Sequence, residues 1–277
     1  MKLYDTHAHV NLAAFKEDRE EIITQALQAG VIINNVGTQK DTSKKAVDLT
    51  KGRENVYAVI GLHPVHTISQ EIDEEESHFI SREEHFDYEY YKALAGDPKV
   101  VGIGECGLDY YRLPEDKTLE EVKTTQKQAF LEQIRLAKEL DKALVIHCRT
   151  QNGSVDAYED ILELLKTEKP PRFEIHSFTS NWDMAQRFLE LGGYIGLNGI
   201  ITFDKSGVLK EVIKNCPLER IVLETDAPYL APPPYRGKRN QPEYVQYVAQ
   251  YIAEVKGLSF EEVCEKTTLN AKTLFKI

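Results

Sequence analysis

The chain has 277 residues, of which 42% are hydrophobic, and its formal net charge is −11. This apolar content is enough for a full core and excludes a disordered chain, and the length suits one large α/β domain. The negative charge argues against a protein that binds long duplex DNA through a basic face. It leaves room for a local basic pocket, or for bound cations, that holds a phosphate.

Strand-like and helix-like runs alternate along the sequence. Eight short runs rich in Val, Ile and Leu predict buried parallel strands. They are Lys2–Asp5, Val31–Val36, Val56–Gly61, Val100–Glu105, Ala143–His147, Arg172–His176, Gly193–Leu197 and Arg220–Glu224. Apolar residues at helical spacing predict helices at Glu17–Ala29, Thr118–Leu140, Val155–Lys166, Trp182–Leu191, Gly207–Asn215, Glu243–Lys256 and Ser259–Thr268.

Eight strand–helix units in this length predict an α/β fold, a TIM (β/α)8 barrel that forms a single domain over residues 1–277. The main alternative is a doubly wound open sheet. The sequence has no Gly-x-Gly-x-x-Gly after the first strand, which weakens the dinucleotide-binding version of that sheet. The acidic segment Ile68–Tyr91 is expected to be a surface excursion after the third strand, and the proline-rich Ala231–Pro234 a loop after the eighth.

The four cysteines are scattered, and they predict neither a disulfide framework nor a zinc knuckle. They are Cys106, Cys148, Cys216 and Cys264. No apolar run approaches the roughly 20 residues that span a bilayer. The N-terminus also lacks the basic and apolar regions of a signal peptide. We therefore expect a cytoplasmic protein that has no membrane partner.

The sequence Asp-Thr-His-Ala-His at residues 5–9 follows a short apolar start. Side chains alternate between the two faces of a strand, so His7 and His9 point the same way. Two imidazoles on one face at the end of a strand can bind a metal ion together.

Further His, Glu and Asp residues lie at or just beyond the ends of later predicted strands. Together with the first pair they give six candidate ligands: His7, His9, Glu105, His147, His176 and Asp226. In a TIM barrel the C-terminal strand ends meet at one mouth, where active sites lie. Four histidines and two carboxylates exceed the needs of one tetrahedral ion. They predict two divalent ions that share a carboxylate, and Mg²⁺, Mn²⁺ and Zn²⁺ are all compatible with these ligands.

Several neighbouring residues have more than one interpretation. His63, in Gly-Leu-His-Pro after the third strand, belongs either to an outer shell or to a contact with a phosphate or leaving group, and His66 lies close behind it. Glu224 is expected to hold a ligand imidazole, and Asp5 to do the same for its neighbours. Asp109 is either a turn residue or part of the site.

Basic and aromatic side chains are also expected near the mouth. They are Arg112, Arg149, Arg236, Lys238 and Arg239, with Tyr110, Tyr111 and Tyr229 as faces on which bases stack. Such a set suits an anionic nucleic-acid substrate. An ordinary solvated loop is the alternative.

Over almost its full length the chain resembles the TatD family of metal-dependent deoxyribonucleases. The shared motifs are Asp5-Thr-His-Ala-His9, Gly61-Leu-His-Pro64, Gly104-Glu-Cys-Gly-Leu-Asp-Tyr-Tyr111, Gln126–Ala137, Ile146-His-Cys-Arg149, His176-Ser-Phe178, Glu224-Thr-Asp-Ala-Pro-Tyr-Leu230, Arg236-Gly-Lys-Arg-Asn240 and Asn270-Ala-x-x-Leu-Phe275. Two mouth loops depart from the family pattern. Ser177-Phe-Thr-Ser180 stands where Cys-Phe-Ser-Gly is usual, and Thr150 stands where Ala is usual. These departures bear on substrate preference more than on metal binding.

The resemblance implies a TIM barrel hydrolase that cuts phosphodiester bonds in DNA, an exonuclease that trims single-stranded ends with divalent metal. It implies one metal site of His7, His9, Glu105 and Asp226 and a second of Glu105, His147 and His176, bridged by Glu105. It also places His63 and Arg149 near the substrate phosphate.

The expected function is therefore a 3′-5′ exonuclease on short or single-stranded DNA ends, acting as a monomer. Asp226 positions the attacking water or takes its proton, and Glu105 shares the catalytic work as the bridge. The expected substrate contacts are His63, Arg149, Tyr110 and Arg236. One alternative is an amidohydrolase or phosphotriesterase-like enzyme that acts on a small ester, lactone or amide. The other is a metal-loaded scaffold that binds protein partners.

Overall fold

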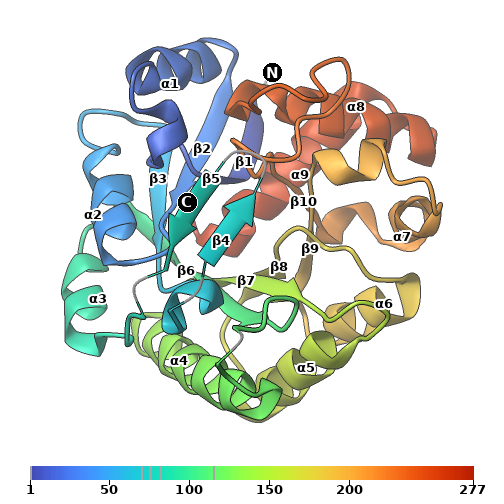
Figure 1. Ribbon diagram of the computed structural model, residues 1–277. Helices are drawn as coiled ribbons and strands as arrows, with labels where there is room; N and C mark the ends of the chain where they lie inside the picture. The colour runs from blue at the N-terminus through green and yellow to red at the C-terminus, as the bar shows by residue number, and fades with distance from the viewer. Residues whose placement is uncertain (1, 70, 75–76, 82, 115) are drawn as a thin grey trace.

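Eight parallel strands form one sheet that curves into a barrel, with helices packed around it (Figure 1). The computed structural model describes residues 2–69, 71–74, 77–81, 83–114 and 116–277. In sheet order the strands are β1 (Leu3–Ala8), β2 (Val31–Val36), β3 (Val56–Ile60), β6 (Val100–Asp109), β7 (Ala143–Arg149), β8 (Phe173–Ile175), β9 (Tyr194–Leu197) and β10 (Ile221–Leu223). Each strand overlaps one predicted run, and the predicted TIM barrel is confirmed.

The barrel closes where β1 meets the segment that follows β10. Ala8 and Ala227 form a parallel bridge there. The backbone N–H of His9 donates to the Ala227 carbonyl at 2.7 Å, and the N–H of Asp226 donates to the His7 carbonyl at 2.8 Å. This seam therefore brings residues from the two ends of the chain side by side at the C-terminal mouth.

Seven helices occupy the predicted runs: α1 (Arg19–Gln28), α4 (Leu119–Leu140), α5 (Asp156–Glu168), α6 (Trp182–Glu190), α7 (Val208–Asn215), α8 (Val245–Lys256) and α9 (Phe260–Phe275). Two further helices, α2 (Lys40–Asp48) and α3 (Tyr88–Leu94), were not predicted. Short 3-10 helices also occur at η1 (Ala13–Phe15), η2 (Pro64–Thr67), η3 (Gly199–Thr202), η4 (Leu218–Arg220) and η5 (Pro242–Tyr244). Helix α9 continues past its predicted end at Thr268 because Ala271, Leu274 and Phe275 keep the helical spacing and are buried.

Two apolar clusters stabilise the barrel. The larger one contains side chains of both strands and surrounding helices. The second contains Tyr4, Val145 and Val222 together with Leu274 and Phe275 of α9. Tyr4 lies near the start of β1, so α9 covers the end of the barrel opposite the mouth. Each large apolar side chain buried in this way contributes about 1.5–3 kcal/mol before entropy costs.

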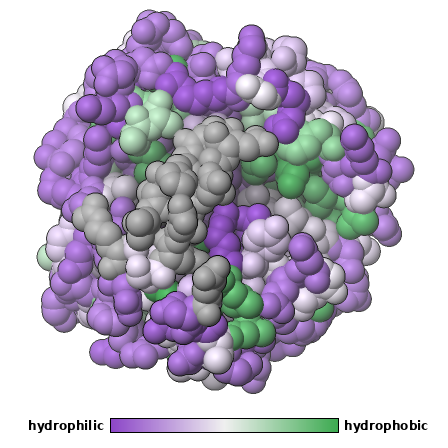
Figure 2. Space-filling model, viewed as in Figure 1, coloured by the Kyte–Doolittle hydropathy of each residue, from purple (hydrophilic) through white to green (hydrophobic). Residues whose placement is uncertain are grey.

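The excursion between β3 and α3 contains a small antiparallel sheet of β4 (Glu71–Glu74) and β5 (Ser77–Ile80). Figure 1 draws this hairpin in front of the ring of strands. Residues 70, 75, 76 and 82 of the predicted excursion lie outside the described residues. The same view in Figure 2 shows a largely hydrophilic face with apolar patches near its edge. No helix within the described ranges is both long enough and apolar enough to cross a bilayer.

Candidate metal centre

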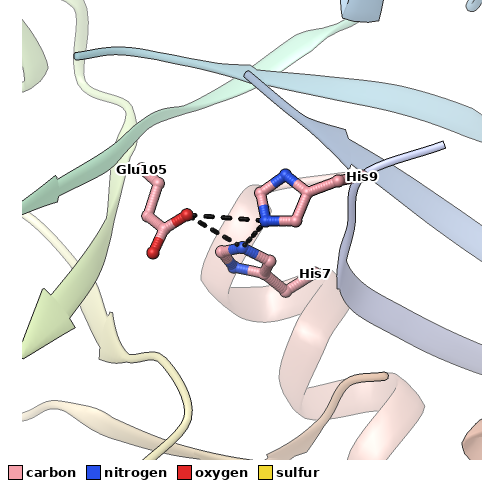
Figure 3. Close-up of side chains that lie close together, drawn as sticks. All are labelled: His7, His9 and Glu105. Atoms are coloured by element: carbon pink, nitrogen blue, oxygen red, sulfur yellow. Dashed lines mark hydrogen bonds and ion pairs between the residues drawn. The ribbon is translucent and has the colours of Figure 1, made fainter. Parts of the chain in front are cut away.

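The end of β1 supplies the first two ligand-type side chains. His7 and His9 are buried, and their Nε2 atoms lie 3.1 Å apart (Figure 3). His9 Nδ1 lies 2.8 Å from the Val36 carbonyl oxygen, so the ring proton sits on Nδ1 and the Nε2 lone pair points into the site. Two ring nitrogens that converge in this way offer a cation a pair of ligands.

Asp5 lies behind this pair and fixes the backbone. Its carboxylate accepts hydrogen bonds from the Thr225 N–H at 2.8 Å, from the Thr225 hydroxyl at 2.6 Å and from the His7 N–H at 3.3 Å. These hydrogen bonds of the carboxylate join the end of β1 to the segment after β10. The expectation that Asp5 holds an imidazole is replaced by this backbone role.

Glu105, in the middle of β6, lies at the centre of the site and is only 3% exposed. Its Oε2 lies 3.3 Å from His7 Nε2 and 3.5 Å from His9 Nε2. Its Oε1 lies 3.2 Å from His63 Nε2 and 2.9 Å from His147 Nδ1. The two oxygens of one carboxylate therefore face two different pairs of histidines.

Asp226 reaches the same site from the segment after β10. Its Oδ1 lies 3.9 Å from His7 Nε2, 3.5 Å from His9 Nε2 and 3.8 Å from His176 Nε2. Its backbone adopts the left-handed conformation with φ 56°, which is uncommon for a residue other than glycine and clusters at functional sites. The buried Asn240 supports this turn, because its amide donates to carbonyl oxygens on both sides of Asp226 at 2.8 and 2.7 Å.

His176 follows β8 and is oriented by Glu224, as expected from the sequence. Glu224 Oε2 lies 2.9 Å from His176 Nδ1, and Glu224 Oε1 accepts a hydrogen bond from the Ser177 N–H at 2.7 Å. The His176 ring stacks on the His7 ring with a centroid separation of 3.5 Å. The carboxylate thus directs Nε2 of His176 toward Asp226.

His63 and His147 line the other side of Glu105. Val65 N–H donates to His63 Nδ1 at 3.1 Å, so the proton of the neutral ring sits on Nε2, and this Nε2–H faces Glu105. His147 lies between two carboxylates, because its Nε2 is 3.2 Å from Asp109 Oδ2. Asp109 Oδ1 also accepts from a following backbone N–H at 3.1 Å, so this residue serves both the turn and the site.

The buried charges shift the histidine pKa values in opposite directions. Burial, aided by His176, lowers the pKa of His7 to about 3, so its ring is neutral. Burial also acts to lower the pKa of His176 and His147. For His176 it is outweighed by Glu224 and Asp226, which raise the pKa to about 10. For His147 it is outweighed by carboxylates on both sides of the ring, which raise the pKa to about 8. Without an ion, these two rings therefore hold protons that an ion would displace.

The structure brings all six predicted ligands together at the mouth. Four groups among the described residues have ligand atoms within 4.8 Å of one another: His7, His9 and Glu105; His7, His176 and Asp226; His63, Glu105 and His147; and, deeper in the barrel, His7, Glu174 and Glu224. The donors are imidazole nitrogens and carboxylate oxygens, and the nearby Cys106 sulfur faces backbone carbonyls instead. This donor set fits Zn²⁺, Mn²⁺ or Mg²⁺.

Two glutamines of α4, which the sequence analysis did not single out, hold the strand ends that carry the site. Gln126 accepts from the Asp109 N–H at 2.8 Å and donates to the Asp109 carbonyl at 2.9 Å. Gln133 makes the same pair of hydrogen bonds with Leu62, at 2.9 and 3.0 Å. Both glutamines are 1% exposed on the otherwise apolar face of α4. Polar residues at such positions are a signal that was available in the sequence.

The predicted substrate contacts fall in different places. Arg149 lies over the Tyr111 ring at 4.1 Å from its centroid, and Tyr111 is 44% exposed. Arg236 lies over the Phe203 ring at 3.8 Å. Tyr110 is fully buried, with its hydroxyl bonded to an α5 carboxylate, so its placement does not support the predicted stacking role. Its neighbour Tyr111 offers the accessible ring.

The other cations near the mouth are engaged with protein groups. Arg112 pairs with Asp109 at 3.3 Å, and Arg239 is held by Asp18 and by the Ala14 carbonyl. Lys238 lies 6.0 Å from the centroid of a tyrosine ring on its own loop. In the predicted basic cluster after the eighth strand, Arg239 therefore holds the fold together by contacts with other protein groups.

A parallel eight-stranded barrel with histidines and carboxylates gathered at its C-terminal mouth defines a class of metal-dependent hydrolases. The chain belongs to the TatD related DNase family, whose family model matches residues 4–276. The resemblance noted in the sequence is thereby confirmed, and the chain is an enzyme of this class.

Individual relatives agree with this assignment. The chain is 39% identical over 278 residues to the uncharacterized metal-dependent hydrolase YabD of Bacillus subtilis, and 99% of each chain is covered. It is 34% identical over 283 residues to the 3′-5′ ssDNA/RNA exonuclease TatD of Escherichia fergusonii, again with 99% of each covered. The crystal structure of YJJV, a TatD homologue from Escherichia coli K12, matches it with a TM-score of 0.82 at 29% identity, covering 99% of this chain and 98% of that one.

Proposed function

We propose that the protein is a 3′-5′ exonuclease that hydrolyses phosphodiester bonds at single-stranded DNA ends with the help of two divalent ions. One observation carries the proposal: Oε2 of Glu105 faces His7 and His9, whereas Oε1 lies 2.9 Å from His147 Nδ1 and 3.8 Å from His176 Nε2, as expected of a carboxylate that bridges two ions. One ion would be held by His7, His9, Glu105 and Asp226, and the other by Glu105, His147 and His176.

Two such ions polarise a phosphoryl oxygen and make a nearby water a stronger nucleophile. The remaining chemistry belongs to side chains of the protein. The Asp226 side chain is 15% exposed and that of Glu105 only 5%, so Asp226 is the carboxylate that opens toward the mouth. Burial raises the pKa of Asp226, but His176 and the β1 histidines outweigh burial and lower it. Asp226 is therefore ionised at neutral pH and suited to orient an attacking water and accept its proton.

The substrate would be held by the two cation–aromatic pairs at the mouth. Arg149 ends β7 beside Tyr111, and Arg236 follows β10 beside Phe203. A guanidinium group binds phosphate oxygens, and an aromatic ring beside it offers a surface for a base. Relatives named as exonucleases for single-stranded DNA and RNA support a polynucleotide substrate. The cytoplasmic location and monomeric state expected from the sequence stay predictions.

The test uses single-stranded DNA labelled at its 5′ end or its 3′ end. With Mn²⁺ or Mg²⁺, the 5′-labelled strand should shorten stepwise, and the 3′-labelled strand should lose its label in the first steps. Glu105→Gln should reduce the rate at least about a hundredfold, because it removes the shared charge of the centre. Glu265→Gln removes an exposed carboxylate on α9 and is the matched control, with the wild-type rate expected.

Two further arms separate the alternatives. RNA of the same sequence tests which nucleic acid is preferred. A panel of small esters, lactones and amides tests the amidohydrolase alternative. Folded protein that hydrolyses members of this panel but releases no nucleotide with any divalent ion would refute the exonuclease proposal.

A further inference from the structure

Glu174 is a buried acidic residue that the proposed reaction does not use. It lies in β8 two residues before His176, so both side chains face the barrel interior, and it is 0% exposed. Among the described residues neither of its oxygens has a hydrogen-bond partner, although the Thr6 hydroxyl lies close by, and burial together with the charge of Glu224 raises the pKa of Glu174 well above its usual value. A buried polar group without a partner costs about 1–3 kcal/mol, so Glu174 is expected to have one.

His7 has the complementary need. Its Nδ1 is buried and has no hydrogen-bond partner among the residues that the structure describes. The stacked rings of His7 and His176 both direct Nε2 toward Asp226, at 3.9 and 3.8 Å. Their Nδ1 atoms therefore lie on the inner side, where Glu224 already accepts a hydrogen bond from His176.

The spacing between these groups matches a bridging water. One oxygen of Glu174, one ring nitrogen of His7 and one oxygen of Glu224 lie within 4.8 Å of one another. Two atoms that each lie about 2.8 Å from the same water oxygen, at a tetrahedral angle, are about 4.6 Å apart. Buried waters occupy polar sites of this kind and make about three hydrogen bonds there.

We propose that Glu174 is a positioning residue for His7. One ordered water accepts the hydrogen bond of the His7 Nδ1–H and donates to an oxygen of Glu174, which keeps the Nε2 lone pair of His7 directed at the ion site. Glu174 then does for His7 what Glu224 does for His176. This inference rests on the proposed metal centre, because orienting His7 matters only when Nε2 binds an ion.

Two measurements test the inference. Nitrogen-15 NMR of the protein loaded with Zn²⁺, a diamagnetic ion, follows the exchange of the His7 Nδ1–H with solvent, and calorimetric titration with Mn²⁺ reports the affinity for each ion. The key variants are Glu174→Leu, which keeps the approximate volume and removes both acceptors, and Glu174→Gln, which keeps an acceptor oxygen. Tyr4→Phe is the matched control, since it removes another buried polar group from the barrel interior, one that bonds to Asn34 at 2.7 Å.

In the wild type, in Glu174→Gln and in Tyr4→Phe, the His7 Nδ1–H should exchange slowly and both ions should bind with similar affinity. In Glu174→Leu this proton should exchange faster, and one ion should bind about 10–100-fold more weakly. Equally slow exchange and wild-type affinity in Glu174→Leu would overturn the inference. So would an Nδ1–H that exchanges freely in the wild type, which needs no variant to fold. Wild-type protein that binds no ion would instead refute the metal centre, and the two failures are therefore distinguishable.

Discussion

Replacing Gln133 with leucine tests how α4 fixes the end of β3. The Gln133 amide pairs with both the N–H and the carbonyl of Leu62, and leucine of similar volume would leave these two backbone groups buried without partners. At about 1–3 kcal/mol for each of the two unsatisfied groups, the expected loss of stability is about 2–6 kcal/mol. For a domain of this size that corresponds to a fall in melting temperature of roughly 4–24 °C. His63 follows Leu62 directly, so the proposed exonuclease activity should fall as well.

The assay is urea unfolding of the metal-free protein followed by far-UV circular dichroism. Gln128→Leu is the matched control, because Gln128 is an exposed glutamine on the same helix. Its stability should stay within about 0.5 kcal/mol of the wild type. A loss below about 1 kcal/mol for Gln133→Leu, or equal losses in the two variants, would refute the reasoning.

Three further predictions concern the site and its backbone. Burial opposes protonation of His147, but Asp109 and Glu105 outweigh burial and raise the pKa of the ring to about 8. The protonated ring therefore stabilises the folded state fully below pH 6.5, and this contribution is lost as the pH rises through about 8. His147 alone should therefore lower the urea midpoint of the metal-free protein by the equivalent of about 2 kcal/mol between pH 6 and 9, and His176, whose pKa is raised to about 10, adds to this fall; a flat profile would contradict the ion pairing. Saturating Mn²⁺ should reverse this slope, because ligand histidines must lose their protons to bind it, and an unchanged slope would argue against histidine ligands. Gly107→Ala should destabilise the fold by more than about 3 kcal/mol, because Gly107 has φ 131° and a Cβ there would lie 2.1 Å from the His147 carbonyl oxygen. Gly153→Ala is the comparison: Gly153 has φ 75° but its Cβ would meet open space, so the cost should be only about 1 kcal/mol.

The fold was largely predictable because buried parallel strands appear as continuous apolar runs. Helix α2 was missed for the opposite reason. It buries only Ser43, Ala46 and Val47 and is otherwise polar, so its apolar periodicity is weak. The predicted run for α9 ended at Thr268, because Thr267 and Thr268 are poor helix formers. In the structure both threonines are buried, and this packing outweighs their low helix propensity.

The candidate ligands were predictable because the C-terminal ends of all strands in a TIM barrel meet at one mouth, so residues far apart in the sequence come close together there. What the sequence could not decide was side-chain direction beyond the strand ends. Tyr110 and Tyr111 are adjacent and alike, yet one points into the core and the other lies open beside Arg149. The proposed pairing of Glu174 with His7 likewise depends on closure of the barrel, because β8 and β1 are not neighbours in the sheet and only share its interior, which no local pattern encodes.

The barrel seam has a consequence for synthesis of the protein. His7 and His9 lie on one side of the Ala8–Ala227 bridge, and Asp226 lies on the other. If these three residues bind one ion, a chain still emerging from the ribosome already has His7 and His9 but lacks Asp226, the carboxylate that completes the site. Under the proposed mechanism, hydrolysis therefore begins only after the last strand has joined the barrel and completed the site.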